Sequence, residues 1–223
     1  MTRLNKHIAL ILGVSRREAD TLIEKKTVKV NGEVARLGQQ IDESSEVEVG
    51  GKKLDKTSKL QYIALNKPVG YVSSRHKQGE SPTIYSLLPP ELHPLKLVGR
   101  LDRDSSGIIL LTNDGDFAHS MTHPSFSKVK IYEVELDKPL EPLHQQMISD
   151  HGIQLEDGVS QFMIEKLDTK GYRITMKEGR NRQIRRTFGS LGYTVTKLHR
   201  TNFGNFSLEN LNLQQGKWCI VTL

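Results

Sequence analysis

The sequence has a single cysteine and a single tryptophan in 223 residues, and it contains no long apolar run. The one cysteine, Cys219, excludes a disulfide framework within the chain and fits a reducing cytosol. No apolar stretch approaches the length of a membrane span, and the first residues lead into no signal-peptide core. We therefore expect a cytoplasmic protein with no membrane partner, and nothing in the sequence demands more than a monomer.

The composition is that of a soluble globular protein, with 36% hydrophobic and 26% charged residues. The formal net charge is +6, which suggests a polyanionic partner. The distribution of charge is more informative, because residues 170–200 carry nine basic side chains and a single acidic one, Glu178. The nine are Lys170, Arg173, Lys177, Arg180, Arg182, Arg185, Arg186, Lys197 and Arg200. This imbalance indicates a surface that binds an anion.

Residues 1–49 form a separate small module. Apolar residues recur at helical spacing from Leu4 to Leu12, and Gly13 is a common helix stop. Ser15 and Glu18 then form a capping box that opens a second helix. The first turn of that helix holds two arginines, against the preference of the helix dipole, which suggests an anionic ligand there.

The second half of this module is rich in strands, and a linker and a larger domain follow it. Residues 27–30 predict a strand that enters a hairpin at Asn31-Gly32, and residues 47–49 predict a second strand. Residues 50–60 are polar, basic and led by glycine, which is typical of a linker. We assign residues 61–223 to the second domain.

The stretch at residues 99–107, Gly-Arg-Leu-Asp-Arg-Asp-Ser-Ser-Gly, precedes a continuous apolar run that predicts a buried strand. Taken alone, its aspartates and serines favour a surface turn. A calcium loop is rejected, because Asn113 stands where a bidentate glutamate is required. A third interpretation makes one carboxylate an ionised nucleophile, since flanking arginines favour the charged form.

Two further segments carry candidate binding residues. Residues 128–136 alternate as a strand in which Lys130 and Tyr132 share a face with apolar residues. Residues 180–188 bring arginines to the start of a helix, which is an anion site. His119 and His123 have helical metal-ligand spacing, but no third ligand is near, and we predict no metal site.

The loop at residues 99–107, the K-x-Y strand and the segment E-G-R-N-R-Q-I-R-R at residues 178–186 together resemble the ribosomal RNA pseudouridine synthases of the small-subunit (RsuA-like) type. One departure is Thr187, where methionine is expected. The module at residues 1–49 looks like the alpha-L RNA-binding motif of ribosomal small-subunit protein four. The resemblance extends over the whole chain.

The resemblance implies an α+β fold with a mainly antiparallel mixed sheet and a small N-terminal α/β RNA-binding module. It implies Asp102 as the nucleophile, Arg185 as the arginine paired with it, and Tyr132 as the ring that stacks on the target base. No cofactor is implied, and the partner is ribosomal RNA. The expected RNA-binding residues are Arg3, Arg16, Arg17, Lys29, Arg100, Lys130, Arg180, Arg182, Gln183 and Arg186.

The expected activity is therefore the isomerisation of a specific uridine in ribosomal RNA to pseudouridine. The main alternative is an RNA-binding protein without catalysis that uses the same basic surface. A second alternative is a hydrolase with Asp102 and Asp104 as paired carboxylates, which would usually depend on magnesium.

Overall fold

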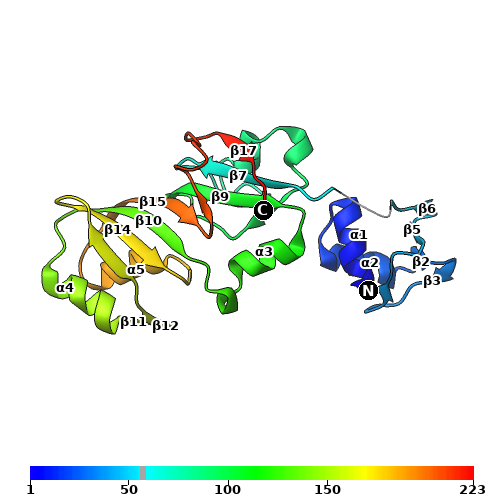
Figure 1. Ribbon diagram of the computed structural model, residues 1–223, viewed down its shortest axis with the longest axis horizontal. Coiled ribbons are helices and arrows are strands. Elements are labelled where there is room, and N and C mark those ends of the chain that lie inside the picture. Colours follow the sequence, from blue (N-terminus) through cyan, green and yellow to red (C-terminus); the bar gives the residue numbers. More distant parts are fainter. Residues whose placement is uncertain (56–58) are drawn as a thin grey trace.

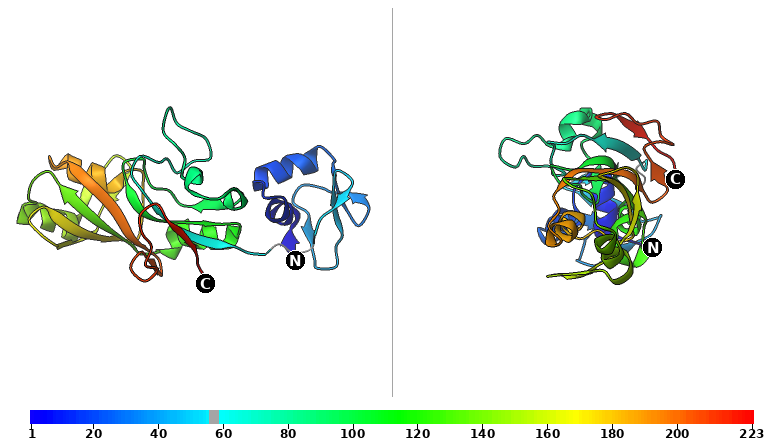
Figure 2. Two further views of the ribbon diagram at one scale, coloured as in Figure 1. Left: turned by 90° about the horizontal axis from the view of Figure 1, so that it is seen from above. Right: turned by 90° about the vertical axis from the view of Figure 1, so that its left-hand side faces the viewer.

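The computed structural model describes residues 1–55 and 59–223 and has an α+β fold, as the sequence predicted. Figure 1 shows a small N-terminal module beside a larger part built on a long twisted sheet. Figure 2 places the module at one end of an elongated molecule. The elements of the module are β1 (Thr2–Arg3), α1 (Leu4–Leu12), α2 (Arg16–Glu24), β2 (Val28–Val30), β3 (Glu33–Val34), β4 (Gln40–Ile41), β5 (Val47–Val49) and β6 (Lys52–Lys53).

The helix stop and the capping box predicted in the N-terminal module are both present in the structure. Helix α1 ends at Gly13, whose φ of 70° is the left-handed conformation that glycine adopts without strain. The Ser15 side chain accepts from the Glu18 amide while Glu18 reaches back to the Ser15 amide, which completes the capping box of α2. The two helices and the sheet bury a core of their own, centred on Leu4 and Ile8.

The segment predicted as a linker, residues 50–60, begins later than expected. Lys52 and Lys53 form β6, which pairs with β5, and the Leu54 amide donates to Val47 at 2.8 Å. The paired Gly50 and Gly51 both have positive φ and make the tight turn between the two strands, so the glycines mark a hairpin here. Residues 56–58 of the predicted linker lie outside the described residues.

The larger part is organised around one mixed sheet with the strand order β13-β14-β10-β15-β9-β7-β17. Its neighbours are antiparallel except for β15 and β9, which run parallel. The strands are β7 (Tyr62–Lys67), β8 (Lys96–Val98), β9 (Ser106–Thr112), β10 (Lys130–Leu136), β13 (Met163–Lys166), β14 (Gly171–Met176), β15 (Val195–Phe203), β16 (Phe206–Ser207) and β17 (Trp218–Ile220). A separate hairpin joins β11 (Ile153–Leu155) to β12 (Gly158–Ser160).

Every residue of β9 is buried, as its continuous apolar run predicted. The strand meets β15 through two residue pairs, one of which joins Gly107 to Arg200. A Cβ on Gly107 would lie 2.2 Å from the Arg200 carbonyl oxygen, and its φ is +113°. Only glycine fits at this position, where the loop at residues 99–107 enters the strand.

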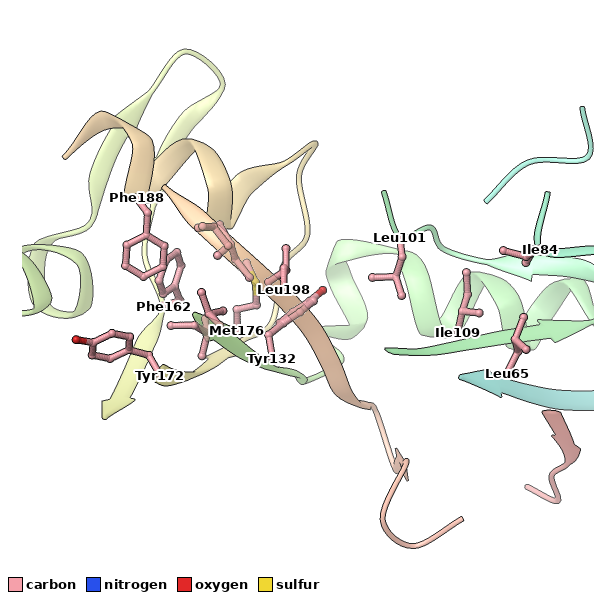
Figure 3. Close-up of a cluster of buried hydrophobic side chains, with 14 of the residues drawn as sticks. Leu65, Ile84, Leu101, Ile109, Tyr132, Phe162, Tyr172, Met176, Phe188 and Leu198 are labelled. Carbon is pink, nitrogen blue, oxygen red and sulfur yellow. The ribbon is translucent and has the colours of Figure 1, made fainter. Parts of the chain in front are cut away.

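Strand β10 alternates as predicted, with Tyr132, Val134 and Leu136 buried on one face. Figure 3 shows Tyr132 close to Leu198 and Met176 in the main hydrophobic core. Tyr132 is 7% exposed. The alternation therefore places the Tyr132 ring on the face of β10 that also carries Lys130.

The helices of the larger part are short. They are α3 (Gly115–Thr122), α4 (Pro142–Gln146), α5 (Gln183–Ser190), the 3-10 turns η1 (Ile84–Leu87), η2 (Pro90–Leu92) and η3 (Pro124–Phe126), and the π turn η4 (Met147–His151). Asp114 caps the start of α3, because its side chain accepts from two backbone amides. No helix in the described residues is long and apolar enough to cross a membrane.

Candidate active site

Hydrogen bonds from β7 and from the residues that follow it hold the backbone of the loop at residues 99–107. Lys67, at the end of β7, donates through Nζ to the carbonyl oxygens of Asp102 at 2.9 Å and Ser105 at 2.6 Å. The Ser73 hydroxyl donates to the Leu101 carbonyl at 2.7 Å. The Asp102 side chain is thus mounted on a backbone fixed at three carbonyls, although it lies in a loop.

Lys67 is fully buried, which is unusual for a lysine. Burial lowers its pKa to about 8, while the nearby carboxylates of Asp102 and Asp104 act in the opposite direction. Its ammonium group also donates to the Pro68 carbonyl at 3.1 Å. Three carbonyl acceptors satisfy the three N–H donors of the ammonium group, so Lys67 has a structural role in holding the loop at residues 99–107.

The two aspartates of the loop face the arginines of the 178–186 segment. Arg182 reaches Asp104 with both terminal nitrogens, at 3.1 and 3.0 Å, and lies 3.6 Å from the Asp102 carboxylate. Partial burial acts to raise the pKa of Asp104, but the Arg182 hydrogen bonds and the Arg185 charge outweigh it and lower that pKa. The loop therefore presents one carboxylate fully engaged with arginine and one, Asp102, only at ion-pair distance.

Arg185 lies differently from the expectation that it pairs with Asp102. Its guanidinium donates to the Val195 and Asp104 carbonyls, at 2.7 and 2.9 Å, and its nearest carboxylate is that of Asp104 at 3.5 Å. The ion pair found on Asp102 comes from Arg182 instead. The physical reason is that the Arg185 guanidinium already donates to two main-chain carbonyls and so joins β15 to the loop at residues 99–107.

A cavity of about 510 Å³ opens beside Asp102, at the junction of the loop, β10 and the arginine segment. Of the predicted site residues it is lined by Arg100, Asp102, Lys130, Tyr132, Arg180, Arg182 and Gln183. Apolar side chains such as Met176, Leu198 and Phe203 form part of its wall. Its size and mixed lining suit a flat heterocycle with polar edges.

One half-buried and one buried cation border this cavity. Lys130 donates to the carbonyls of Lys128 and Lys177, each at 3.2 Å, and burial lowers its pKa. Arg200 is 2% exposed, donates to the Ile108 carbonyl at 2.8 Å and lies over the Phe203 ring. The cavity is therefore positive as well as partly apolar, which favours a nucleotide.

The remaining arginines of the segment are tied to a neighbouring acid. Arg186 forms two hydrogen bonds to Asp157, at 3.0 and 2.7 Å, and Arg180 binds the same carboxylate at 3.2 Å. Asp157 sits in the turn between β11 and β12, far from these arginines in the sequence. The basic segment is thus partly neutralised by acids from other elements, which its local sequence could not show.

The predicted RNA-binding residues of the N-terminal module, Arg3, Arg16, Arg17 and Lys29, are all exposed and lie outside the cavity. The module touches the larger part through an ion pair between Lys6 and Asp116 and a hydrogen bond from Lys96 to the Val14 carbonyl. Asp116 is in the first turn of α3, whose last residue, Thr122, lines the cavity. The structure thus separates two candidate RNA-binding regions, with α3 between them.

In the described residues, no group of three or more histidine, cysteine or acidic side chains could hold a metal ion. His119 and His123 lie side by side at a ring distance of 4.7 Å, as their spacing predicted, and no third ligand joins them.

Sequence reasoning missed Lys67, Glu178 and Arg200 as parts of the site. The burial of Lys67 depends on contacts with residues 35 and 38 positions away in the sequence. Glu178 accepts from Arg180 and Gln183 inside the arginine segment. Arg200 was counted only as surface charge, although its position in the alternating strand β15 could have indicated burial.

The arrangement provides a half-exposed carboxylate at ion-pair distance from a guanidinium, beside a basic and aromatic cavity. Such a carboxylate can act as a nucleophile or a base without a metal. A base inside a helix would have to leave its stack to enter this cavity and reach Asp102. These features fit an enzyme that acts on a nucleic acid.

Comparison with known proteins gives the family. The sequence model of the RNA pseudouridylate synthase family matches residues 61–190, and that of the S4 domain matches residues 2–47. The chain is 36% identical to the ribosomal small subunit pseudouridine synthase A of Pasteurella multocida, over 97% of this chain and 94% of that protein. It is 35% identical to the ribosomal large subunit pseudouridine synthase B of Bacillus subtilis, over 95% and 89%.

A crystal structure described as a pseudouridylate synthase superposes with a TM-score of 0.70 at 33% identity, covering all of this chain and 96% of the other. The chain belongs to the RNA pseudouridylate synthase family and carries an N-terminal S4 domain. It is an isomerase that acts on RNA.

Proposed function

We propose that this enzyme converts a specific uridine of ribosomal RNA to pseudouridine, with Asp102 as the nucleophile. The observation that carries the proposal is the meeting of Asp102, Arg182 and Tyr132 at one cavity. The relatives named above are ribosomal RNA enzymes of both the small and the large subunit, so the proposal covers either RNA.

In the proposed reaction, the target uridine leaves its stack and enters the cavity, where Tyr132 stacks on the uracil ring. The N1–C1′ glycosidic bond breaks, the uracil turns while still bound, and C5 bonds to C1′. The proton that leaves C5 is matched by one gained at N1, and the bond that Asp102 forms to the substrate is broken again before the product leaves. Because the product has the same atoms and the same oxidation level as the substrate, the reaction consumes no oxidant, reductant or group donor. Lys130 and the arginines of the 178–186 segment are assigned to phosphates and to the electrostatic field of the cavity.

We further propose that the N-terminal domain, residues 1–49 with β6 added, binds ribosomal RNA through Arg3, Arg16, Arg17 and Lys29, and that residues from about 61 onward form the catalytic domain. Two linked binding regions raise the effective concentration of the cavity near its target. We place this activity in the cytoplasm, on an assembling ribosomal subunit, and expect a monomer to suffice.

The test uses unmodified transcripts of both ribosomal RNAs, incubated with the full-length protein and then mapped for pseudouridine. We expect one or a few modified positions with the wild type and none with Asp102→Asn, while the RNA affinity of the variant stays close to that of the wild type. Asn keeps the shape of Asp and removes no phosphate contact.

Three outcomes would overturn parts of this proposal. No pseudouridine with the wild type on either RNA would exclude ribosomal RNA as the free substrate. Equal loss of binding and of product in Asp102→Asn would show that Asp102 supports RNA binding and not the reaction. Product that disappears in excess chelator would point to magnesium chemistry in place of the metal-free route.

A further inference from the structure

Three aromatic side chains gather at the rim of the active-site cavity, at the C-terminal end of α3. The His119 and His123 rings lie 4.7 Å apart and only 30° from parallel. The Phe126 ring meets both edge-on, at 5.7 and 6.4 Å. We call His119, His123 and Phe126 the rim cluster.

The rim cluster is exposed, unlike an aromatic group of a protein core. All three residues are exposed, and Phe126 keeps 48% of its accessible surface. Aromatic surface of this kind costs free energy in water unless a ligand covers it. The cluster therefore has ring surface available for a partner.

The rim cluster is continuous with the cavity. Thr122 and Pro124, the neighbours of His123 on either side, both line the cavity that Asp102 borders. Figure 1 shows α3 on the side of the catalytic domain that faces the N-terminal module. An RNA that contacts both the N-terminal module and the cavity would therefore pass next to α3.

The side chain of His123 and the turn that carries Phe126 are also held in place before any ligand arrives. The His123 Nδ1 atom lies 2.8 Å from the Ser125 hydroxyl and accepts from the Ser125 amide at 3.3 Å. Ser127 adopts a left-handed conformation with φ 45°, which closes the η3 turn that carries Phe126. A pre-formed surface loses little conformational entropy when it binds.

The charge around the rim cluster suits RNA. No acidic residue occurs between Asp116 and Glu133, a stretch that includes Lys128 and Lys130. When one nucleotide is extruded into a cavity, its neighbour loses a stacking partner. An aromatic ring beside the cavity can replace the lost stack, and such stacking accepts any base.

We propose that the rim cluster is a stacking site for an unpaired base next to the target uridine, so that the enzyme holds two nucleotides and not one. This inference rests on the proposed function, since it places the site beside a uridine in the cavity. The ligand class is a single-stranded RNA base, and the contact is to its ring face.

The test measures the affinity of full-length protein for two fluorescein-labelled RNA hairpins. One has a loop of uridines, and the other has the same loop with abasic riboses at alternate positions. Phe126→Ala is expected to weaken the uridine hairpin about tenfold and the abasic hairpin much less. His119→Ala, which is favourable for the helix, provides an independent variant with the same expected direction.

Two controls separate stacking from packing. Phe126→Tyr keeps the ring and is expected to bind within about twofold of the wild type, whereas Phe126→Leu keeps the bulk and is expected to behave like Phe126→Ala. Leu143→Ala removes an apolar side chain from α4 that is even more exposed than Phe126, at 63%, and is expected to change neither affinity.

The proposal is overturned if Phe126→Leu binds like the wild type, or if Phe126→Ala weakens both hairpins equally. Because these measurements are of binding alone, they remain interpretable if no pseudouridine forms on ribosomal RNA. That result would count against the proposed function and would leave the stacking site intact.

Discussion

The ammonium group of Lys67 lies 2.9 Å from the main-chain carbonyl oxygen of Asp102 and carries the backbone on which the proposed nucleophile is mounted. The side chain of Asp102 remains half-exposed while its backbone is anchored in the core. This separation explains how a loop residue can hold a fixed position beside a cavity.

The burial of Lys67 predicts a stability change at alkaline pH. Its pKa is about 8 in the folded protein and near 10.5 in the unfolded chain, so the unfolded state binds more protons between these values. Stability relative to Lys67→Met is therefore expected to rise as the pH increases from about 8 to about 10.5. Urea unfolding of both proteins across this range measures the difference, and a flat difference would contradict it.

A prediction of the opposite kind concerns Asp104 at acid pH. Because arginine contacts lower its folded pKa, its contribution to stability is present above the usual carboxyl range and is lost as the pH falls through the folded value. Asp104→Asn should cost about 1 kcal/mol or less near neutrality, since the group is half-exposed. The gap between variant and wild type should close below about pH 4, and a gap that widens there would refute this sign.

Gly107 is predicted to tolerate no side chain. Gly107→Ala would place a Cβ 2.2 Å from the Arg200 carbonyl at a φ of +113°, and we expect a loss of at least ~2 kcal/mol in unfolding free energy. Gly189→Ala is the matched control, because it lies in α5 with nothing within 4 Å and should stabilise the protein by up to about 1 kcal/mol. Thermal unfolding of the two variants distinguishes them, and similar melting temperatures would contradict the argument.

The arginines at the start of α2 are predicted to act through charge alone. The double variant Arg16→Gln, Arg17→Gln should raise KM and leave kcat unchanged, because these residues lie outside the cavity. If each binds one phosphate, the slope of log affinity against log salt should become shallower by about 1.5. Lys166→Gln, an exposed basic residue on β13, serves as the control and should leave the slope unchanged.

The elements that sequence reasoning predicted well are those that depend on local chemistry. The capping box at Ser15, the stop at Gly13, the buried strand before Asn113 and the alternation around Tyr132 are each specified within a few residues. Residues 84–87 form only a 3-10 turn, because Pro82 and Pro89 leave little room between them.

The details of the site were less accessible, since they depend on residues far apart in the chain. Motif resemblance identified Asp102 and the arginine segment as neighbours, but it could not tell which guanidinium faces which carboxylate. In the structure, Arg185 donates to the carbonyl oxygen of Val195, and Arg182 is the arginine that lies at ion-pair distance from Asp102. Asp157 likewise engages two arginines from a hairpin that showed no chemistry of its own.

The edge strand β17 has a consequence for how the protein is made. It completes the sheet by pairing with β7, so that Ile63 lies opposite Ile220 and the Asn66 amide donates to Lys217. During synthesis β7 leaves the ribosome long before β17, so one edge of β7 stays unpaired until β17 has been made. Contacts between such distant residues form slowly, so nascent chains of this enzyme should remain unable to modify RNA until that strand has been released.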